Sequence, residues 1–162
     1  MNVDERLAAL ESRLRAVEDE LAVVRVVTSY GPLIDLGEPE AVAALWDADG
    51  VYDVDTGLYE GQAGISAMVA SDAHQGLLDR GCAHLLSTPH VTVLGDTAVA
   101  VGHSQLVVRS DRGYHVARAS AHRWELARHD GSWRVVRRTS RLLDGTSTPR
   151  ELLRLPEPDQ AG

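Results

Sequence analysis

The sequence predicts a single α+β domain, in which N-terminal helices pack on a strongly curved, mixed but mainly antiparallel sheet that encloses a pocket. Two observations predict this fold. Apolar residues recur with a helical period over the first thirty residues, whereas alternating, strand-like runs fill residues 83–143. Turn sequences typical of hairpins separate those runs at Gly95-Asp96, Asp111–Gly113 and Asp130-Gly131.

The N-terminal helix is expected over residues 3–30. Its apolar residues recur at spacings of three and four, as in a coiled-coil seam. The seam consists of Leu7, Leu10, Leu14, Val17, Leu21 and Val24. Two interpretations fit this pattern: the helix covers the sheet, or its first half projects and pairs with a second subunit. Gly31-Pro32 is expected to interrupt the helix, because proline lacks a backbone donor and disfavours helix at the preceding residue.

The other elements of the domain, which spans residues 1–145, follow in order. Helices are expected over residues 40–47 and 62–71, with a short strand over 51–55 between them and a polar loop leading to Gly81. Four strands are expected over residues 83–94, 97–110, 114–128 and 133–143. The C-terminal tail, residues 146–162, is expected to hold a short helix over 150–155 and a disordered end.

Composition and charge exclude several functions. The 162 residues carry a net charge of −8, which argues against a nucleic-acid partner. The absence of lysine excludes Schiff-base catalysis. The single cysteine, Cys82, cannot form an internal disulfide and fits a reducing compartment. Neither a signal peptide nor an apolar membrane span is recognisable, so a soluble, cytoplasmic protein without a membrane partner is expected.

The order of several segments carries a family resemblance. A helix with Tyr30 and Asp35 precedes LWDAD, VYDVDTG and YEGQAGISAM, and these precede GCAHLL, ASAHRWEL and HDGSWRVVRRTSRLLDG. From about Leu21 to Gly145 this order resembles the SnoaL-like branch of the nuclear transport factor 2-like superfamily. The resemblance implies a cone-shaped fold with one small-molecule pocket.

Within that superfamily the pattern is most similar to scytalone dehydratase and bile-acid 7α-dehydratase. The resemblance implies an acid–base enzyme of dehydratase, isomerase or cyclase type, with no cofactor and no metal. Its substrate would be a small apolar, oxygenated metabolite such as a polyketide, steroid or terpenoid. The superfamily also holds non-catalytic ligand-binding proteins, which stay the alternative. An epoxide hydrolase-like site needs two carboxylates beside an arginine, and the long strands offer no second carboxylate there.

The catalytic candidates are Asp35, His84, Tyr30 and His122. Asp35 lies among apolar residues, either at the surface or buried as a partner, and the resemblance favours the second. A carboxylate would orient the imidazole of His84 and raise its basicity, which makes the pair a candidate general base. The alternative is a core histidine bonded to backbone. Tyr30 either donates its hydroxyl to a substrate oxygen or covers the seam between helix and sheet.

Strand alternation supplies the candidate substrate-binding residues. Arg118, Ser120, His122 and Trp124 share one side of their strand, as a pocket wall would. The resemblance suggests His103 on the neighbouring strand, although a shift of one residue would turn Ser104 inward instead. The other candidates are Tyr52, Trp46 and Met68. Arg137, Arg138 and Arg141 are interpreted as a solvated basic face, the alternative being that one of them pairs with Asp35, with a substrate carboxylate or across an interface. His74, His90, His115 and His129 are interpreted as surface residues.

A homodimer is the expected assembly. The other side of the 114–128 strand carries the small residues Ala117, Ala119 and Ala121, which suit an outer face or a subunit interface. No short spacing of histidines typical of a metal site is present, so no metal is expected.

Overall fold

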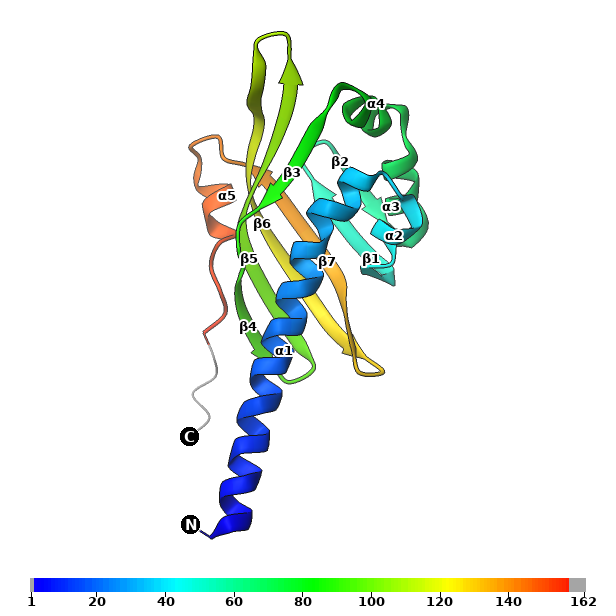
Figure 1. Cartoon of the computed structure of the whole chain (residues 1–162). Coiled ribbons are helices and arrows are strands. Elements are labelled where there is room, and N and C mark those ends of the chain that lie inside the picture. Colours follow the sequence, from blue (N-terminus) through cyan, green and yellow to red (C-terminus); the bar gives the residue numbers. More distant parts are fainter. Residues whose placement is uncertain (1, 158–162) are drawn as a thin grey trace.

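The computed structural model describes residues 2–157 (Figure 1). It begins with the long helix α1 (Val3–Leu36), followed by α2 (Pro39–Ala43), β1 (Trp46–Val54) and β2 (Gly57–Glu60). Two further helices, α3 (Gly61–Ala70) and α4 (Asp72–Arg80), precede β3 (Cys82–Leu86) and β4 (His90–Leu94). The long strands β5 (Thr97–Ser110), β6 (Gly113–His129) and β7 (Ser132–Leu142) complete the sheet, and α5 (Ser147–Glu151) follows them.

The seven strands form one mixed sheet in the order β2-β1-β7-β6-β5-β3, with β4 also paired to β5. The contact between β1 and β7 is parallel, and all other pairs are antiparallel. Helix α1 crosses one face of this sheet, and α2, α3 and α4 gather at one end of it (Figure 1). The predicted fold class, helices on a mixed and mainly antiparallel sheet, is therefore confirmed.

Helix α1 differs from the prediction at Gly31-Pro32, which does not end it. The helix continues to Leu36, with Pro32 exposed inside its last turns. A helix interior tolerates proline when packing offsets the lost hydrogen bond. Here Tyr30 and Ile34, on either side of the proline, are 3% and 1% exposed and belong to the core. Tertiary contacts therefore keep this segment helical.

The segment between α3 and β3 is a second difference from the prediction. Residues 72–80 form helix α4 rather than a polar loop. The hydroxyl of Ser71 accepts a hydrogen bond from the backbone N–H of His74 at 3.3 Å, and this cap starts the helix. The predicted strand over residues 83–94 is also divided, because Pro89 precedes β4 and the chain leaves the sheet between β3 and β4.

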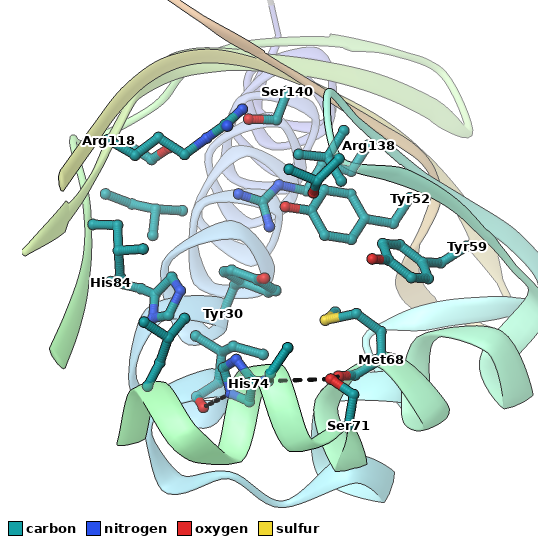
Figure 2. A pocket seen from close by; sticks show the side chains of 18 of the residues that line it. Tyr30, Tyr52, Tyr59, Met68, Ser71, His74, His84, Arg118, Arg138 and Ser140 are labelled. Atoms are coloured by element: carbon teal, nitrogen blue, oxygen red, sulfur yellow. Dashed lines mark hydrogen bonds between the residues drawn. The ribbon is translucent and has the colours of Figure 1, made fainter. Parts of the chain in front are cut away.

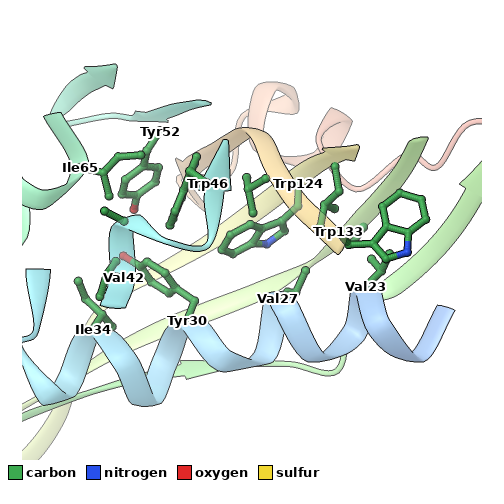
Figure 3. Close-up of a cluster of buried hydrophobic side chains, with 14 of the residues drawn as sticks. Val23, Val27, Tyr30, Ile34, Val42, Trp46, Tyr52, Ile65, Trp124 and Trp133 are labelled. Atoms are coloured by element: carbon green, nitrogen blue, oxygen red, sulfur yellow. The ribbon is translucent and has the colours of Figure 1, made fainter. Parts of the chain in front are cut away.

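The core lies where the middle of α1 meets the sheet. Val23, Val27 and Tyr30 project from α1 toward the sheet, with Val23 nearest Trp133, Val27 nearest Trp124, and Tyr30 between Trp46 and Trp124 (Figure 3). The rings of Tyr30 and Trp124 meet nearly edge to face with centroids 5.7 Å apart. In a sequence without phenylalanine, tryptophan and tyrosine supply the large core side chains.

The outer face of the sheet is partly covered by α5, which packs on β6 and β7. Ala121, one of the small residues expected at a subunit interface, is completely buried within the chain. The short helix itself lies over residues 147–151 rather than 150–155. The prediction of a disordered end falls mainly on residues 158–162, which lie outside the described residues. Within residues 2–157, the helices lack an apolar stretch of the length that crossing a bilayer requires.

Candidate active site

A pocket of about 490 Å³ lies between the concave face of the sheet and the helices at its open end (Figure 2). Its polar walls come from α1, β1, β2, α4, β3, β5, β6 and β7. They consist of Tyr30, Tyr52, Thr56, Tyr59, Ser71, His74, His84, Ser104, Gln105, Arg118, Arg138 and Ser140. The apolar lining consists of Ile34, Val54, Met68, Ala73, Leu77, Leu86 and Leu106. A small molecule with an apolar body and a few oxygen atoms fits this lining.

Asp35 and His84 are in direct contact at the pocket wall. The carboxylate of Asp35 accepts two hydrogen bonds from His84, one from Nδ1 at 2.7 Å and one from the backbone N–H at 2.9 Å. Because a carboxylate only accepts, Nδ1 carries the proton of the neutral ring. Nε2 therefore keeps its lone pair, and the doubly held imidazole has a fixed orientation.

Glycine at position 31 permits this contact. A Cβ at Gly31 would lie 2.5 Å from the carbonyl oxygen of His84, well inside a van der Waals contact. The absence of a side chain lets β3 approach α1 closely enough for Asp35 to reach both donors of His84. The same Gly-Pro pair that suggested a break in the helix thus serves the packing of helix against strand.

Burial lowers the pKa of His84 below its ordinary value of 6.5, against the opposing effect of Asp35, which raises it. The positive charge of Arg138 and the ring of His74 also lower this pKa. The imidazole is therefore neutral near pH 7, which is the state that accepts a proton.

Arg138 is the main cationic group of the pocket. It is 2% exposed, and its guanidinium carbon lies 4.0 Å from the ring centroid of Tyr30, 4.6 Å from that of Tyr52 and 4.3 Å from that of Trp124. Such stacking on aromatic faces is favourable for a guanidinium. Within residues 2–157, its Nε and Nη1 have no hydrogen-bond partner.

A buried cation with unsatisfied donors is costly, and it commonly marks a place where a ligand supplies the missing acceptor. Figure 2 shows the guanidinium of Arg138 directed into the hollow between Tyr30 and Tyr52. Burial raises the pKa of Tyr30 above its ordinary value, so its phenol stays protonated beside this cation. Arg138 and Tyr30 together offer N–H and O–H donors to an oxygen with negative charge.

His122, a predicted catalytic residue, lies outside the pocket lining. Its Nε2 donates to the carbonyl of His103 at 3.0 Å, and its Nδ1 accepts from the indole N–H of Trp124 at 2.6 Å. Burial, aided by the charge of Arg138, lowers its pKa to about 3. Both ring nitrogens are thus occupied, and the arrangement is that of a structural core histidine.

Strand β6 contributes to the pocket at Arg118 but not at the residues that follow. Ser120 is 1% exposed, lies outside the lining and has no partner for its hydroxyl among the described residues. On β5, Ser104 lines the pocket and His103 is exposed, which resolves the alternative left open by the sequence. On the neighbouring strand β7, Ser140 and Arg138 line the pocket beside His122 and Trp124, which do not.

The remaining candidates divide between pocket and core. Tyr52 and Met68 line the pocket, whereas Trp46 and Trp124 are completely buried in the core. Arg118 lines the pocket and forms an ion pair with Asp55, which lies outside the lining.

Arg138 and His74 are the two most notable of the pocket residues that the sequence interpretation did not name as candidates. The sequence interpretation favoured a solvated basic face for Arg138 and a surface position for His74. His74 is 7% exposed, lines the pocket and donates from Nε2 to the carbonyl of Ile34 at 3.0 Å. Strand alternation could have singled out Arg138 in the sequence. Its side chain lies on the opposite side of β7 from those of Arg137 and Arg141, which pair with Asp53.

One group of side chains has the spacing of a metal site. Ligand atoms of Asp35, Cys82 and His84 all lie within 4.8 Å of one another. The hydrogen bond to Asp35 already uses Nδ1 of His84, and burial raises the pKa of the Cys82 thiol, which favours the protonated form. The geometry therefore fits a hydrogen-bonded acid–base pair better than a metal centre.

The fold and this pocket place the chain in a known family. The model of the SnoaL-like domain matches residues 15–139, and the chain belongs to that family, within the nuclear transport factor 2-like superfamily. No curated protein matches the chain significantly.

Solved structures of the same fold support this assignment. An NTF2-like protein with a cystatin-like fold from Novosphingobium aromaticivorans is 40% identical with a TM-score of 0.89, over 92% of this chain and 97% of that one. A protein of unknown function from Mycobacterium tuberculosis is 22% identical with a TM-score of 0.70, over 93% and 80%. Aln2 from a Streptomyces species is 20% identical with a TM-score of 0.69, over 78% and 92%. The last two similarities concern the fold alone.

Proposed function

We propose that this protein is a cofactor-independent acid–base enzyme, of dehydratase, isomerase or cyclase type, that forms an enolate from a small, apolar, oxygenated metabolite. The observation that carries the proposal is the contact between Asp35 and His84, which leaves Nε2 of a neutral imidazole open to the pocket. The SnoaL-like family includes polyketide cyclases and dehydratases, which agrees with such chemistry.

In the proposed step, Nε2 of His84 removes a proton from the carbon beside a substrate carbonyl. The electron pair of the broken C–H bond moves into the new C=C bond, and the carbonyl π electrons move onto oxygen. The imidazolium formed is stabilised by the carboxylate of Asp35, which already holds Nδ1–H at 2.7 Å.

Arg138 and Tyr30 are the proposed partners of the developing oxyanion. The guanidinium has unsatisfied donors inside the pocket. Its positive charge stabilises a negative oxygen most strongly where water is excluded. Placing the carbonyl oxygen there positions the adjacent carbon toward His84. Loss of a hydroxyl, migration of the double bond or attack on a second carbonyl would then complete elimination, isomerisation or ring closure.

Exchange of the substrate α-proton tests the step that all three outcomes share. Ketones of polyketide, steroid and terpenoid type would be incubated with the protein in D₂O, and deuterium uptake followed by mass spectrometry. His84→Ala and Asp35→Asn are expected to lower the exchange rate by about 10²–10⁴-fold. His103→Ala is the matched control, because His103 is exposed and lies outside the lining of this pocket.

Two results would count against the proposal. Variants of His84 and Asp35 that exchange protons at the wild-type rate would remove the pair from the chemistry. Ketones that bind the pocket without any exchange would favour the alternative, a non-catalytic protein that binds a small ligand.

A further inference from the structure

The first half of α1 carries an exposed apolar strip along one side of an otherwise charged helix. It projects beyond the sheet, away from the helices at the open end of the pocket (Figure 1). Six apolar residues on this segment are between 45% and 78% exposed. They are Val3, Leu7, Leu10, Leu14, Val17 and Leu21. Among residues 2–157, Asp19 near the end of the segment is bonded to Arg128 and Trp133, but the strip itself stays exposed. An exposed apolar strip of this kind is typical of an interface.

The projecting segment is nevertheless built to be helical. Asn2 caps it by accepting from the N–H of Glu5 at 2.9 Å, and the Glu5 side chain accepts from the N–H of Asn2 at 2.7 Å. This reciprocal capping box specifies the start of the helix. Because most helical stability in proteins comes from packing of an apolar face, the exposed strip on this well-capped segment points to a partner that covers it.

Charges beside the strip define which partner fits. With Leu7, Leu14 and Leu21 at heptad position a, position d holds Val3, Leu10, Val17 and Val24. Position g then holds Arg6, Arg13 and Glu20, and position e of the following heptads holds Glu11, Glu18 and Arg25. In a parallel pair of helices, each g residue faces the e residue five positions later on the other helix.

All three of these contacts pair opposite charges when the partner is a second copy in register. Arg6 faces Glu11 of the partner subunit, Arg13 faces Glu18 of the partner subunit, and Glu20 faces Arg25 of the partner subunit. The six residues involved are exposed in the chain and available for such pairing. In the third contact the acidic and basic residues exchange places relative to the first two. Because Glu20 and Arg25 change together, the contact still joins opposite charges.

An antiparallel arrangement does not satisfy the same charges. It would bring the e positions of the two helices together, where Asp4, Glu11 and Glu18 are acidic and Arg25 alone is basic. A membrane surface is also a poor match, because residues 3–21 hold six acidic residues against three arginines.

We propose that the projecting half of α1 forms a parallel, in-register coiled coil with a second copy of this chain. The pairing leaves the domain intact, because the residues that pack α1 on the sheet, Val23, Val27, Tyr30 and Ile34, lie on a different stripe of the helix. The segment is also largely an addition to the family domain, since the SnoaL-like match begins at residue 15.

Light scattering on the full chain provides the first test. The wild-type chain is expected to have the mass of a dimer, and Leu14→Glu that of a monomer. Ser12→Glu is the matched control, because it adds the same charge to the same turn at position f, away from the strip. Tryptophan fluorescence reports whether the core around Trp124 is intact in each variant.

Charge exchange tests the register and direction. Arg13→Glu alone or Glu18→Arg alone places like charges at two symmetric contacts and is expected to weaken the dimer about tenfold. The double variant restores opposite charges in the parallel pair and is expected to recover the wild-type dissociation constant. In Leu10→Cys, oxidation is expected to join the two copies at position 10, with the wild-type chain as the control for Cys82.

Three outcomes would overturn the proposal. A wild-type monomer at all accessible concentrations would show that the strip has no second copy as its partner. A dimer unchanged by Leu14→Glu would place the interface elsewhere, for example on the sheet. Failure of the double charge variant to recover affinity, or failure of Leu10→Cys to cross-link, would exclude the parallel register.

Discussion

Two buried or half-buried histidines, His84 and His122, show how the same side chain serves different roles. His84 lies at the open end, with Nδ1 held by Asp35 and Nε2 open to the pocket. His122 is buried on β6, with Nε2 bonded to the His103 carbonyl and Nδ1 to the Trp124 indole. Burial lowers the pKa of both rings. The difference lies in the partners, because only His84 keeps a nitrogen for a ligand.

The same contrast extends to the groups around each histidine. His122 and Trp124 in the core are held by a hydrogen bond and a ring contact, whereas Arg138 in the pocket keeps unsatisfied donors. Functional sites often retain such unfavourable arrangements at some expense of stability. Substitutions in the two regions should therefore have different effects. Those in the core should lower stability, and those in the pocket should lower ligand affinity.

The largest expected effect is the pH dependence that His122 gives to stability. Its pKa falls from 6.5 to about 3 on folding, so the unfolded chain binds the extra proton. The stabilisation is complete above pH 6.5 and is lost as the pH falls toward 3. Over that window the free energy of unfolding should fall by about 1.4 kcal/mol per pH unit.

Urea unfolding curves at pH 7, 6 and 5 would measure this slope. His122→Gln, which keeps an amide donor and acceptor but has no titrating ring, should reduce it relative to wild type. An equal slope in the variant would show that other groups, such as carboxylates, dominate the dependence.

The next effect concerns the contact between α1 and β3. Gly31→Ala would place a Cβ 2.5 Å from the His84 carbonyl, so the strand must move. We expect a loss of about 2 kcal/mol in unfolding free energy, together with a weakened hold of Asp35 on His84. Gly64→Ala in α3 is the matched control, because its Cβ would meet only ordinary contacts at 3.6 Å or more and helix propensity favours alanine.

Chemical denaturation and the chemical shifts of the His84 ring would test the pair of glycine variants. A Gly31→Ala protein as stable as wild type would contradict the argument that close packing requires glycine at this position.

The smallest expected change in stability is a gain at the pocket end. Arg138→Met removes a buried cation with unsatisfied donors and retains much of its packing against the aromatic rings. Stability should rise by about 1 kcal/mol, while affinity for ligands with an anionic or enolic oxygen falls. Thermal unfolding and ligand titration of the same variant would test both effects. Destabilisation with unchanged ligand affinity would instead indicate that Arg138 mainly serves the core.

Part of the site could be predicted because the segments that carry it resemble those of a known family. Asp35 and His84 are separated by 49 residues, yet the family resemblance suggested the pair, and the structure brings the two side chains into contact. Arg138 could not be assigned in the same way. Strand parity separates it from Arg137 and Arg141, but only packing determines that this side faces three aromatic rings rather than solvent.

His122 and Ser120 show the opposite failure of strand alternation, because residues on the predicted side of the strand need not line the pocket. Both lie on the same side of β6 as Arg118, as the alternation indicated, but neither lines the pocket, although Ser140, the neighbour of His122 on β7, does. Where α1 crosses the sheet determines which inward-facing residues meet a ligand and which meet the core. That crossing point depends on long-range contacts, such as Gly31 against β3, that no short segment encodes.

By itself, the sequence determined the fold class, the hairpin strands and the apolar strip on the N-terminal helix, because each follows from local periodicity and turn chemistry. The tertiary structure decided three further features: the continuation of α1 through Pro32, the helix at residues 72–80 and the buried position of Arg138. The physical reason is common to all three. Each depends on the free energy of packing against residues distant in the chain, which outweighs local preference.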